Sequence, residues 1–221
     1  MDNRPMIAPA PALPRTWDAR LAQRLVTPLK DTWVTPNHLT TLRLMIGLVG
    51  AGCLARGGFG WANAGAFLIV LSNFVDHADG ELARISGKSS LTGHIYDLAG
   101  DALITVLLFT CMGAGLADPA QETTMSPTVL GLIAGVAVAV IFFLRMRIES
   151  LAGKAGTTQS SIAGFETEDV LYLLPLVTLS DTTASFLTAA AIGAPLFMLW
   201  VIVDYRRVVR RVVRHTRPGP E

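Results

Sequence analysis

Apolar residues occur along the chain in blocks long enough to cross the hydrocarbon core of a membrane. A transmembrane helix needs about 20 mostly apolar residues, and five blocks approach this length. A sixth block, which contains Pro175, is shorter. In chain order the blocks cover residues 39–55, 61–75, 98–116, 129–144, 170–179 and 186–203. The pattern predicts an all-α integral membrane protein with six transmembrane helices, in which residues 170–179 supply the fifth span.

A different periodicity precedes the first block. Apolar side chains recur at helical spacing at Trp17, Leu21, Leu25 and Leu29. The spacing predicts an amphipathic helix over residues 15–34, which either lies in the membrane interface or packs on the surface of the protein itself. Prolines at four of the first 14 positions predict a disordered arm over residues 1–14. Residues 35–205 then form one membrane domain, followed by a basic tail over residues 206–221.

Lys and Arg are distributed unevenly among the segments that join the blocks. They occur before the first block, between the second and third, between the fourth and fifth, and in the tail, whereas residues 117–128 and 180–185 carry none. The positive-inside rule therefore predicts that both termini face the cytoplasm. The expected location is the inner (cytoplasmic) membrane of a prokaryote. The formal net charge of +1 gives no bulk electrostatic case for binding nucleic acid.

Four aspartates lie in or beside these apolar blocks, at Asp76, Asp79, Asp97 and Asp101. A carboxylate at membrane depth is costly, so it marks a functional site by default, usually with a partner of opposite charge. Spacings of three and four residues place each pair on one face of a helix, and a short connection brings the two faces together. Carboxylate oxygens without a Cys or His cluster suit Mg²⁺, Mn²⁺ or Ca²⁺. His77 and His94 are neighbours in sequence, but on a helix they point away from the flanking aspartates.

Several carboxylates can hold two cations, which would clamp the oxygens of an in-line phosphoryl displacement. A diphosphate substrate is therefore a natural partner for this cluster. Gly80, Ala83 and Gly93 would let a base or a phosphate approach the helix backbone, although small residues also serve helix packing in lipid. Arg84 stands where it could pair with a phosphate oxygen.

Residues 76–101 follow the pattern D-x-x-D-G-x-x-A-R, eight residues, then G-x-x-x-D-x-x-x-D. This pattern closely resembles the signature of the CDP-alcohol phosphotransferase (phosphatidyltransferase) family. Residues 35–40, T-P-N-H-L-T, are similar to a second family motif that precedes the first span. The resemblance implies an enzyme of phospholipid synthesis with six transmembrane helices, usually a homodimer. It would displace CMP from a CDP-linked donor by the hydroxyl of an acceptor alcohol.

The resemblance also implies roles for individual residues. It gives Asp76, Asp79 and Asp97 the ligation of one or two divalent cations, Mg²⁺ or Mn²⁺, and gives Asp101 both a metal contact and the role of general base. The implied nucleotide-binding residues are Asp79, Gly80, Ala83, Arg84 and Gly93.

The identities of donor and acceptor are less constrained by the sequence. In one half of the family the donor is CDP-diacylglycerol and the acceptor a polar alcohol; in the other half a CDP-amino alcohol reacts with a lipid hydroxyl. The short chain resembles the first group. Arg145, Arg147 and Lys154 would suit an acceptor that carries a phosphate, but positive-inside topology explains them equally well. The neighbouring acidic residues could neutralise these cations or hold an amine; they are Glu166, Glu168 and Asp169.

A transporter that uses the aspartates as an ion relay is an alternative from another class of protein. It would scatter carboxylates through several spans near the midplane of the membrane. Here they cluster at one predicted cytoplasmic end, which favours the enzyme.

Overall fold

The structure, a computed structural model, describes residues 17–117, 125–152 and 171–216, which contain helices and no strand. The all-α prediction is confirmed for these residues. The elements are α1 (Trp17–Val26), a short 3₁₀ helix η1 (Thr27–Leu29), α2 (Pro36–Arg56), α3 (Phe59–Ser86), α4 (Leu91–Gly115), α5 (Pro127–Ala152), α6 (Leu174–Leu179) and α7 (Thr183–Thr216). The predicted arm over residues 1–14 lies outside the described residues.

Four helices, α2, α4, α5 and α7, are long and apolar enough to cross a membrane. Helix α3 has 28 residues, but asparagines and two aspartates interrupt its apolar sequence. Within the predicted fifth span the structure describes α6, whose six residues rise only about 9 Å, and the residues immediately before 171 lie outside the described ranges. The structure therefore supports an integral membrane protein, and the count of six spans stays a prediction.

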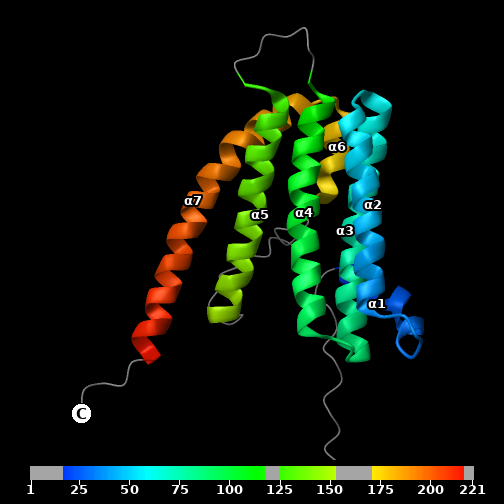
Figure 1. Ribbon diagram of the computed structural model, residues 1–221, viewed down its shortest axis with the longest axis vertical. Helices are drawn as coiled ribbons and strands as arrows, with labels where there is room; N and C mark the ends of the chain where they lie inside the picture. The colour runs from blue at the N-terminus through cyan, green and yellow to red at the C-terminus, as the bar shows by residue number, and fades with distance from the viewer. Residues whose placement is uncertain (1–16, 118–124, 153–170, 217–221) are drawn as a thin grey trace, which may run out of the picture.

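The long helices run side by side (Figure 1). Helix α2 packs against both α3 and α4, whereas α3 and α4 make few direct contacts with each other. On the other side of the bundle, α4 packs against α5 and α5 against α7. Side chains from α2 are thus well placed to reach α3 and α4 together.

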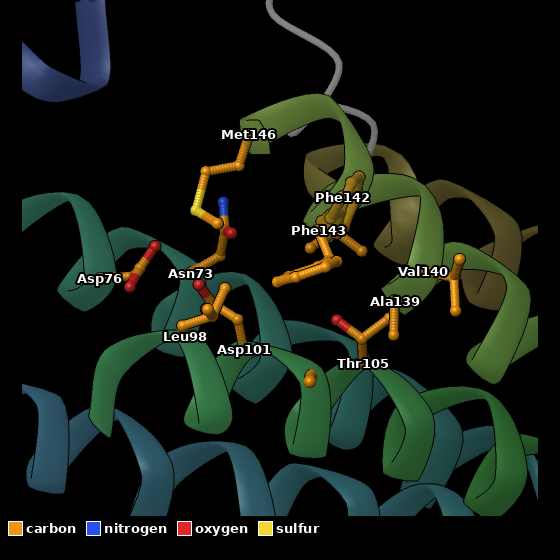
Figure 2. Close-up of a pocket in the computed structure, with 12 residues that line it drawn as sticks. Asn73, Asp76, Leu98, Asp101, Thr105, Ala139, Val140, Phe142, Phe143 and Met146 are labelled. Carbon is orange, nitrogen blue, oxygen red and sulfur yellow. The ribbon is translucent and has the colours of Figure 1, made fainter. Parts of the chain in front are cut away.

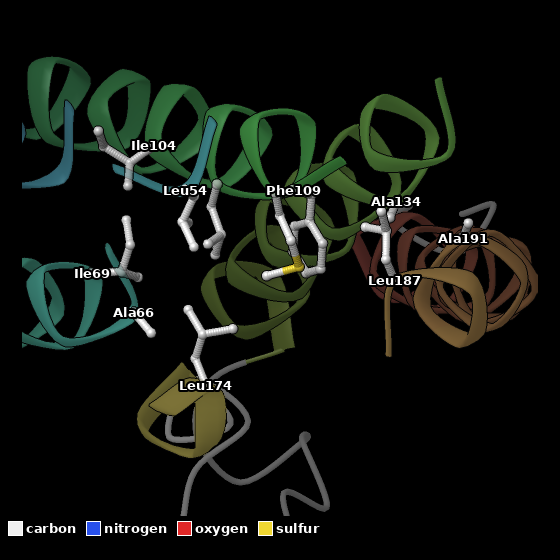
Figure 3. Packing of buried hydrophobic residues seen from close by; sticks show 11 residues of the cluster. Leu54, Ala66, Ile69, Ile104, Phe109, Ala134, Leu174, Leu187 and Ala191 are labelled. Carbon is white, nitrogen blue, oxygen red and sulfur yellow. The ribbon is translucent and has the colours of Figure 1, made fainter. Parts of the chain in front are cut away.

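A buried apolar cluster joins six helices (Figure 3). Leu174 of α6 faces Ala66 and Ile69 of α3, and Phe109 of α4 lies between them and the α5–α7 side. The cluster comprises Leu54, Ala66, Ile69, Ile104, Leu108, Phe109, Met112, Ala134, Leu174, Leu187 and Ala191. This packing fixes how the helices stand relative to one another.

The link between α3 and α4 consists of residues 87–90 alone. Gly87 ends α3 with φ of +66°, in the left-handed region that favours glycine. Ser90 caps α4, because its Oγ accepts a hydrogen bond of 3.0 Å from the backbone N–H of Gly93. Both helix ends are therefore defined by local contacts, and the two aspartate pairs lie close to this link.

Helix α1 packs against α3, one of the two arrangements that the sequence left open. Ala22 and Val26 are buried against Ala78 and Leu82, in the part of α3 that carries the first two aspartates. Leu21 and its neighbour one turn later, Leu25, remain exposed. Contact of this exposed face with the membrane interface stays a prediction.

Helices α4 and α5 approach closely because α5 presents glycines to α4. A Cβ atom on Gly131 would lie 2.1 Å from the carbonyl oxygen of Phe109, so no larger residue fits without separating the backbones. Small residues at such positions are typical of helix packing in membranes.

We predict that Gly131→Ala lowers the free energy of unfolding by about 1–3 kcal/mol through this overpacking. The measurement is thermal unfolding of the purified protein in detergent. Gly193→Ala in α7 is the matched control, because nothing lies within 4 Å of the added methyl group. Equal midpoints for the two variants would contradict the close approach of α4 and α5.

Candidate active site at the aspartate cluster

The four aspartates lie on two helices near the α3–α4 link. Helix α3 continues past the predicted block 61–75 to Ser86, so that Asp76 and Asp79 are helical, and Asp97 and Asp101 follow in the first part of α4. One carboxylate oxygen from each of Asp76, Asp97 and Asp101 lies within 4.8 Å of the other two. Asp79 stands beside this group but outside it. The structure thus brings three of the four predicted metal ligands into one cluster.

Arg43 of α2 reaches all four carboxylates from the interior of the bundle. Its Nη2 donates to Asp97 Oδ1 at 2.6 Å and to the Asp97 carbonyl at 2.9 Å, and its Nη1 donates to Asp101 Oδ1 at 2.7 Å. Its Nε lies 3.0 Å from Asp76 Oδ1 and 3.6 Å from Asp79 Oδ2. With 3% of its side chain exposed, Arg43 is a buried partner charge for these carboxylates.

Asp79 has a second partner on α2. The Thr40 hydroxyl donates to Asp79 Oδ2 at 2.8 Å, and both residues are buried. Asn37, one turn earlier, lies against Gly93, where an added Cβ would be 2.7 Å from Asn37 Oδ1. The start of α2 is therefore fitted to both halves of the aspartate motif.

The aspartates differ in their access to solvent. The exposed fraction of the side chain is 6% for Asp79, 24% for Asp76, 34% for Asp97 and 43% for Asp101. Asp101 is therefore the most accessible of the four to an incoming group.

The donor set fits a hard divalent cation. The clustered atoms are all carboxylate oxygens, the ligands that Mg²⁺ and Mn²⁺ prefer. Each carboxylate has two oxygens and several lone pairs, so contact of one oxygen with Arg43 does not prevent metal ligation. The two Cys residues lie outside this cluster.

A small cavity of about 200 Å³ opens on the Asp79 and Asp97 side of the cluster. Gly80, Ala83 and Gly93, which the sequence predicts to bind nucleotide, all line it. The other lining residues are Pro36, Asn37, Thr40, Asp79, Lys88, Ser89, Ser90, His94 and Asp97. The small residues of the motif therefore surround one polar space beside two of the aspartates.

A second cavity of about 360 Å³ opens on the Asp76 and Asp101 side (Figure 2). Phe142, Phe143 and Met146 of α5 face the two aspartates across it. The remaining lining residues are Asn73, Leu98, Ala102, Thr105, Ala139, Val140 and Leu171. Eight of the twelve residues that line it are apolar, and the carboxylates of Asp76 and Asp101 stand at one wall.

Of the predicted cationic residues that the structure describes, none lines either of these two cavities. Arg84 pairs with Glu81 at 2.5 Å and does not line the smaller cavity. Arg145 packs its guanidinium over the rings of Phe197 and Trp200 of α7, at 5.7 and 5.4 Å, and Arg147 is exposed. Lys154, the third predicted acceptor-binding residue, lies outside the described residues. The prediction of an acceptor site at these cations is therefore untested.

Sequence reasoning missed several residues of the site. Arg43 is the most important, and the signal was a lone charge inside the block 39–55, which calls for a partner of opposite sign. Thr40 and Asn37 were noted only as parts of the motif at residues 35–40. Lys88 was counted as a topology signal, but it lines the smaller cavity while its Nζ donates to the carbonyl of Thr32 at 2.7 Å.

Together these features describe a helical membrane protein whose clustered carboxylates stand between two cavities, an arrangement suited to metal-assisted chemistry on phosphate. Comparison with known families makes the class specific. Residues 33–204 match the family described as CDP-alcohol phosphatidyltransferase, and the chain belongs to this family. Membership of a family described as a phosphatidyltransferase favours the enzyme over the transporter alternative.

Two curated relatives are similar over part of their length. The chain is 28% identical over 126 residues to the "Bifunctional IPC transferase and DIPP synthase" of Rubrobacter xylanophilus, an alignment that covers 57% of this chain and 27% of that protein. It is 29% identical over 140 residues to the phosphatidylinositol phosphate synthase of Cutibacterium acnes, covering 62% and 64% respectively. The matches thus span about a quarter and somewhat under two thirds of these relatives.

The fold is also similar to that of a solved structure. The Mycobacterium tuberculosis phosphatidylinositol phosphate synthase, crystallised with CDP-DAG bound, superposes with a TM-score of 0.57 and 22% identity. The superposition covers 90% of this chain and 96% of that one.

Gly80 provides a test of the smaller cavity. It lies in the interior of α3 with nothing within 4 Å of an added Cβ, so packing does not require glycine there. Glycine within a helix costs about 1 kcal/mol relative to alanine. We therefore predict that Gly80→Ala raises thermal stability but weakens CMP binding about tenfold, equivalent to about 1.4 kcal/mol, because the methyl group enters the cavity.

Calorimetric titration with CMP is the measurement, and Gly52→Ala is the matched control. Gly52 is exposed on α2, again with nothing within 4 Å, so its variant should gain stability and bind CMP as the wild type does. Unchanged CMP affinity in Gly80→Ala would contradict the assignment of this cavity to the nucleotide.

Proposed function

We propose that this protein transfers a phosphatidyl group from CDP-diacylglycerol to the hydroxyl of a polar alcohol and releases CMP. The observation that carries the proposal is the position of the aspartate cluster, which forms a wall of both cavities. The smaller, polar cavity would take the cytidine and the adjoining phosphate. The diphosphate would then lie at the cluster, with its reacting phosphorus accessible from the side of Asp101.

Asp101 is the proposed general base. It is the most exposed of the four carboxylates and faces the larger cavity. As the acceptor oxygen bonds to the phosphorus that carries the diacylglycerol, its proton passes to the Asp101 carboxylate. The bond from that phosphorus to the bridging oxygen breaks, and CMP leaves with the oxygen and both electrons.

Asp76, Asp79, Asp97 and Asp101 are the residues proposed to hold one or two Mg²⁺ or Mn²⁺ ions. Bound there, divalent cations would offset the negative charge of the diphosphate. Asp79 is held by Thr40, and Asp97 and Asp101 are held by Arg43. The chain therefore fixes the orientation of its carboxylates before substrate arrives, which lowers the cost of assembling the site.

Relatives support CDP-diacylglycerol as the donor. The superposable synthase was crystallised with CDP-DAG, and a relative in sequence is named as a phosphatidylinositol phosphate synthase. The apolar lining of the larger cavity suits the hydrocarbon that would adjoin the phosphate, whichever substrate carries the lipid. Binding of a phosphorylated alcohol by Arg145, Arg147 and Lys154 stays a prediction. The orientation of the site toward the cytoplasm and the formation of a homodimer are predictions as well.

We predict Mn²⁺- or Mg²⁺-dependent release of CMP from CDP-diacylglycerol when a suitable alcohol is supplied, and loss of this activity in EDTA. The assay uses the purified protein in lipid nanodiscs with a panel of free and phosphorylated alcohols. In the same assay Asp101→Asn is expected to lower turnover about 10²-fold or more while CMP affinity changes little.

Glu81→Gln is the control for a lost carboxylate, because Glu81 lies on the same helix as Asp76 but pairs with Arg84 outside both cavities. Activity with a CDP-amino alcohol and diacylglycerol in place of CDP-diacylglycerol would instead establish the reverse assignment of lipid and alcohol. Turnover of Asp101→Asn near the wild-type rate would remove the general base from that residue.

A further inference from the structure

Arg43 brings a single positive charge to four carboxylates. Its guanidinium lies within 3.6 Å of an oxygen of each aspartate, so the group of five side chains has a formal charge of −3. Four like charges at this spacing repel one another strongly where water is scarce. A cation at their centre is therefore the simplest means of keeping them together.

The contacts of Arg43 differ from those of an optimal arginine–carboxylate pair. Such pairs are commonly bidentate, with two parallel hydrogen bonds to one carboxylate. Here Nη1 and Nη2 bond to carboxylates of different residues, and the buried Nε makes no hydrogen bond of adequate geometry although Asp76 is 3.0 Å away. One guanidinium is thus shared among the carboxylates of four residues and makes no bidentate pair with any one of them.

The surrounding backbone is fitted to this single side chain. Helix α2 packs against both α3 and α4, so it can place one cation between the two aspartate pairs. Gly100 of α4 leaves the room: an added Cβ would lie 3.3 Å from Arg43 Nη2 and 2.9 Å from Leu44 Cδ2. Ser72 of α3 donates to the Arg43 carbonyl at 2.8 Å and fixes the backbone from which the side chain extends.

We propose that Arg43 is a positioning residue, an internal counter-cation that keeps the four motif aspartates assembled before a divalent cation binds. The inference rests on the proposed metal site. Arg43 and a bound metal ion are attracted to the same carboxylates, so the presence of either cation weakens the attraction of the carboxylates for the other. By linkage, loss of the arginine then destabilises the metal-free protein more than the metal-bound protein.

The test compares thermal unfolding of the purified full-length protein in EDTA and in saturating Mn²⁺. Arg43→Met removes the charge, and Arg43→Lys keeps it. Arg56→Met is the matched control, because Arg56 stacks on Trp61 at the far end of α2 and its loss also removes one positive charge. All variants are purified in Mn²⁺ before the metal is removed.

The expected result is a lower midpoint for Arg43→Met in EDTA and a rise on adding Mn²⁺ about twofold larger than in the wild type. Arg43→Lys and Arg56→Met should show the wild-type rise. A rise in Arg43→Met equal to that of the wild type, or smaller, would overturn the proposal, because Arg43 would then only fill space or assist the metal. Failure of Arg43→Met to fold even in Mn²⁺ would overturn it as well.

Two outcomes separate this inference from the proposed function. If Mn²⁺ raises the midpoint of the wild type, and raises the midpoint of Arg43→Met by the same amount or less, the metal site stands and the counter-cation role fails. If Mn²⁺ moves no midpoint at all, the metal site itself is wrong and the inference falls with it.

Discussion

Neutralisation of charge inside an apolar bundle is the constraint on which the rest of this structure depends. Carboxylates among membrane helices are costly, and these four are tolerated because α2 carries one buried guanidinium into their midst. Helix α2 packs against both α3 and α4, and Gly100 leaves room beside Leu44 and Arg43. The charge at the centre is incomplete, since one cation faces four anions. The negative charge that Arg43 leaves uncompensated favours the binding of a divalent cation at this site.

The two cavities beside the aspartates also differ in the residue types that line them. On one side the motif glycines, the start of α2 and mostly polar residue types enclose the smaller cavity, and on the other side α5 contributes aromatic and sulfur-containing side chains. A molecule with a nucleotide at one end and hydrocarbon at the other matches this difference. Membership of the CDP-alcohol phosphatidyltransferase family and the different linings of the two cavities agree with the proposed reaction, in which a phosphate that stays bonded to lipid passes from a nucleotide to an alcohol.

Much of this could be predicted from sequence, because periodicity and motif spacing are local properties. The long helices, the helical pairing of the aspartates and the cavity around Gly80, Ala83 and Gly93 all follow from such patterns. Arg43 was missed because its role depends on contacts among three helices, made between residues that are far apart in the sequence. The predicted binding roles of Arg84 and Arg145 stay predictions. In the structure Arg84 pairs with Glu81 one turn earlier on α3, and Arg145 stacks on Phe197 and Trp200 of α7. The contact of Arg145 depends on tertiary packing, which residue spacing alone does not contain.

The four-residue link between α3 and α4 has a consequence for how the motif can vary. Gly87 ends one helix and Ser90 begins the next, so the link leaves little freedom between them. Each residue added to a helix turns everything beyond it by about 100°. One insertion within the first turn of α4 would therefore carry Asp97 and Asp101 around the helix axis, away from Arg43. The length of the eight-residue spacer therefore determines the rotation of α4 about its own axis, and with it the direction in which Asp97 and Asp101 point. A chain with a spacer of another length must restore that rotation elsewhere to keep the four carboxylates together.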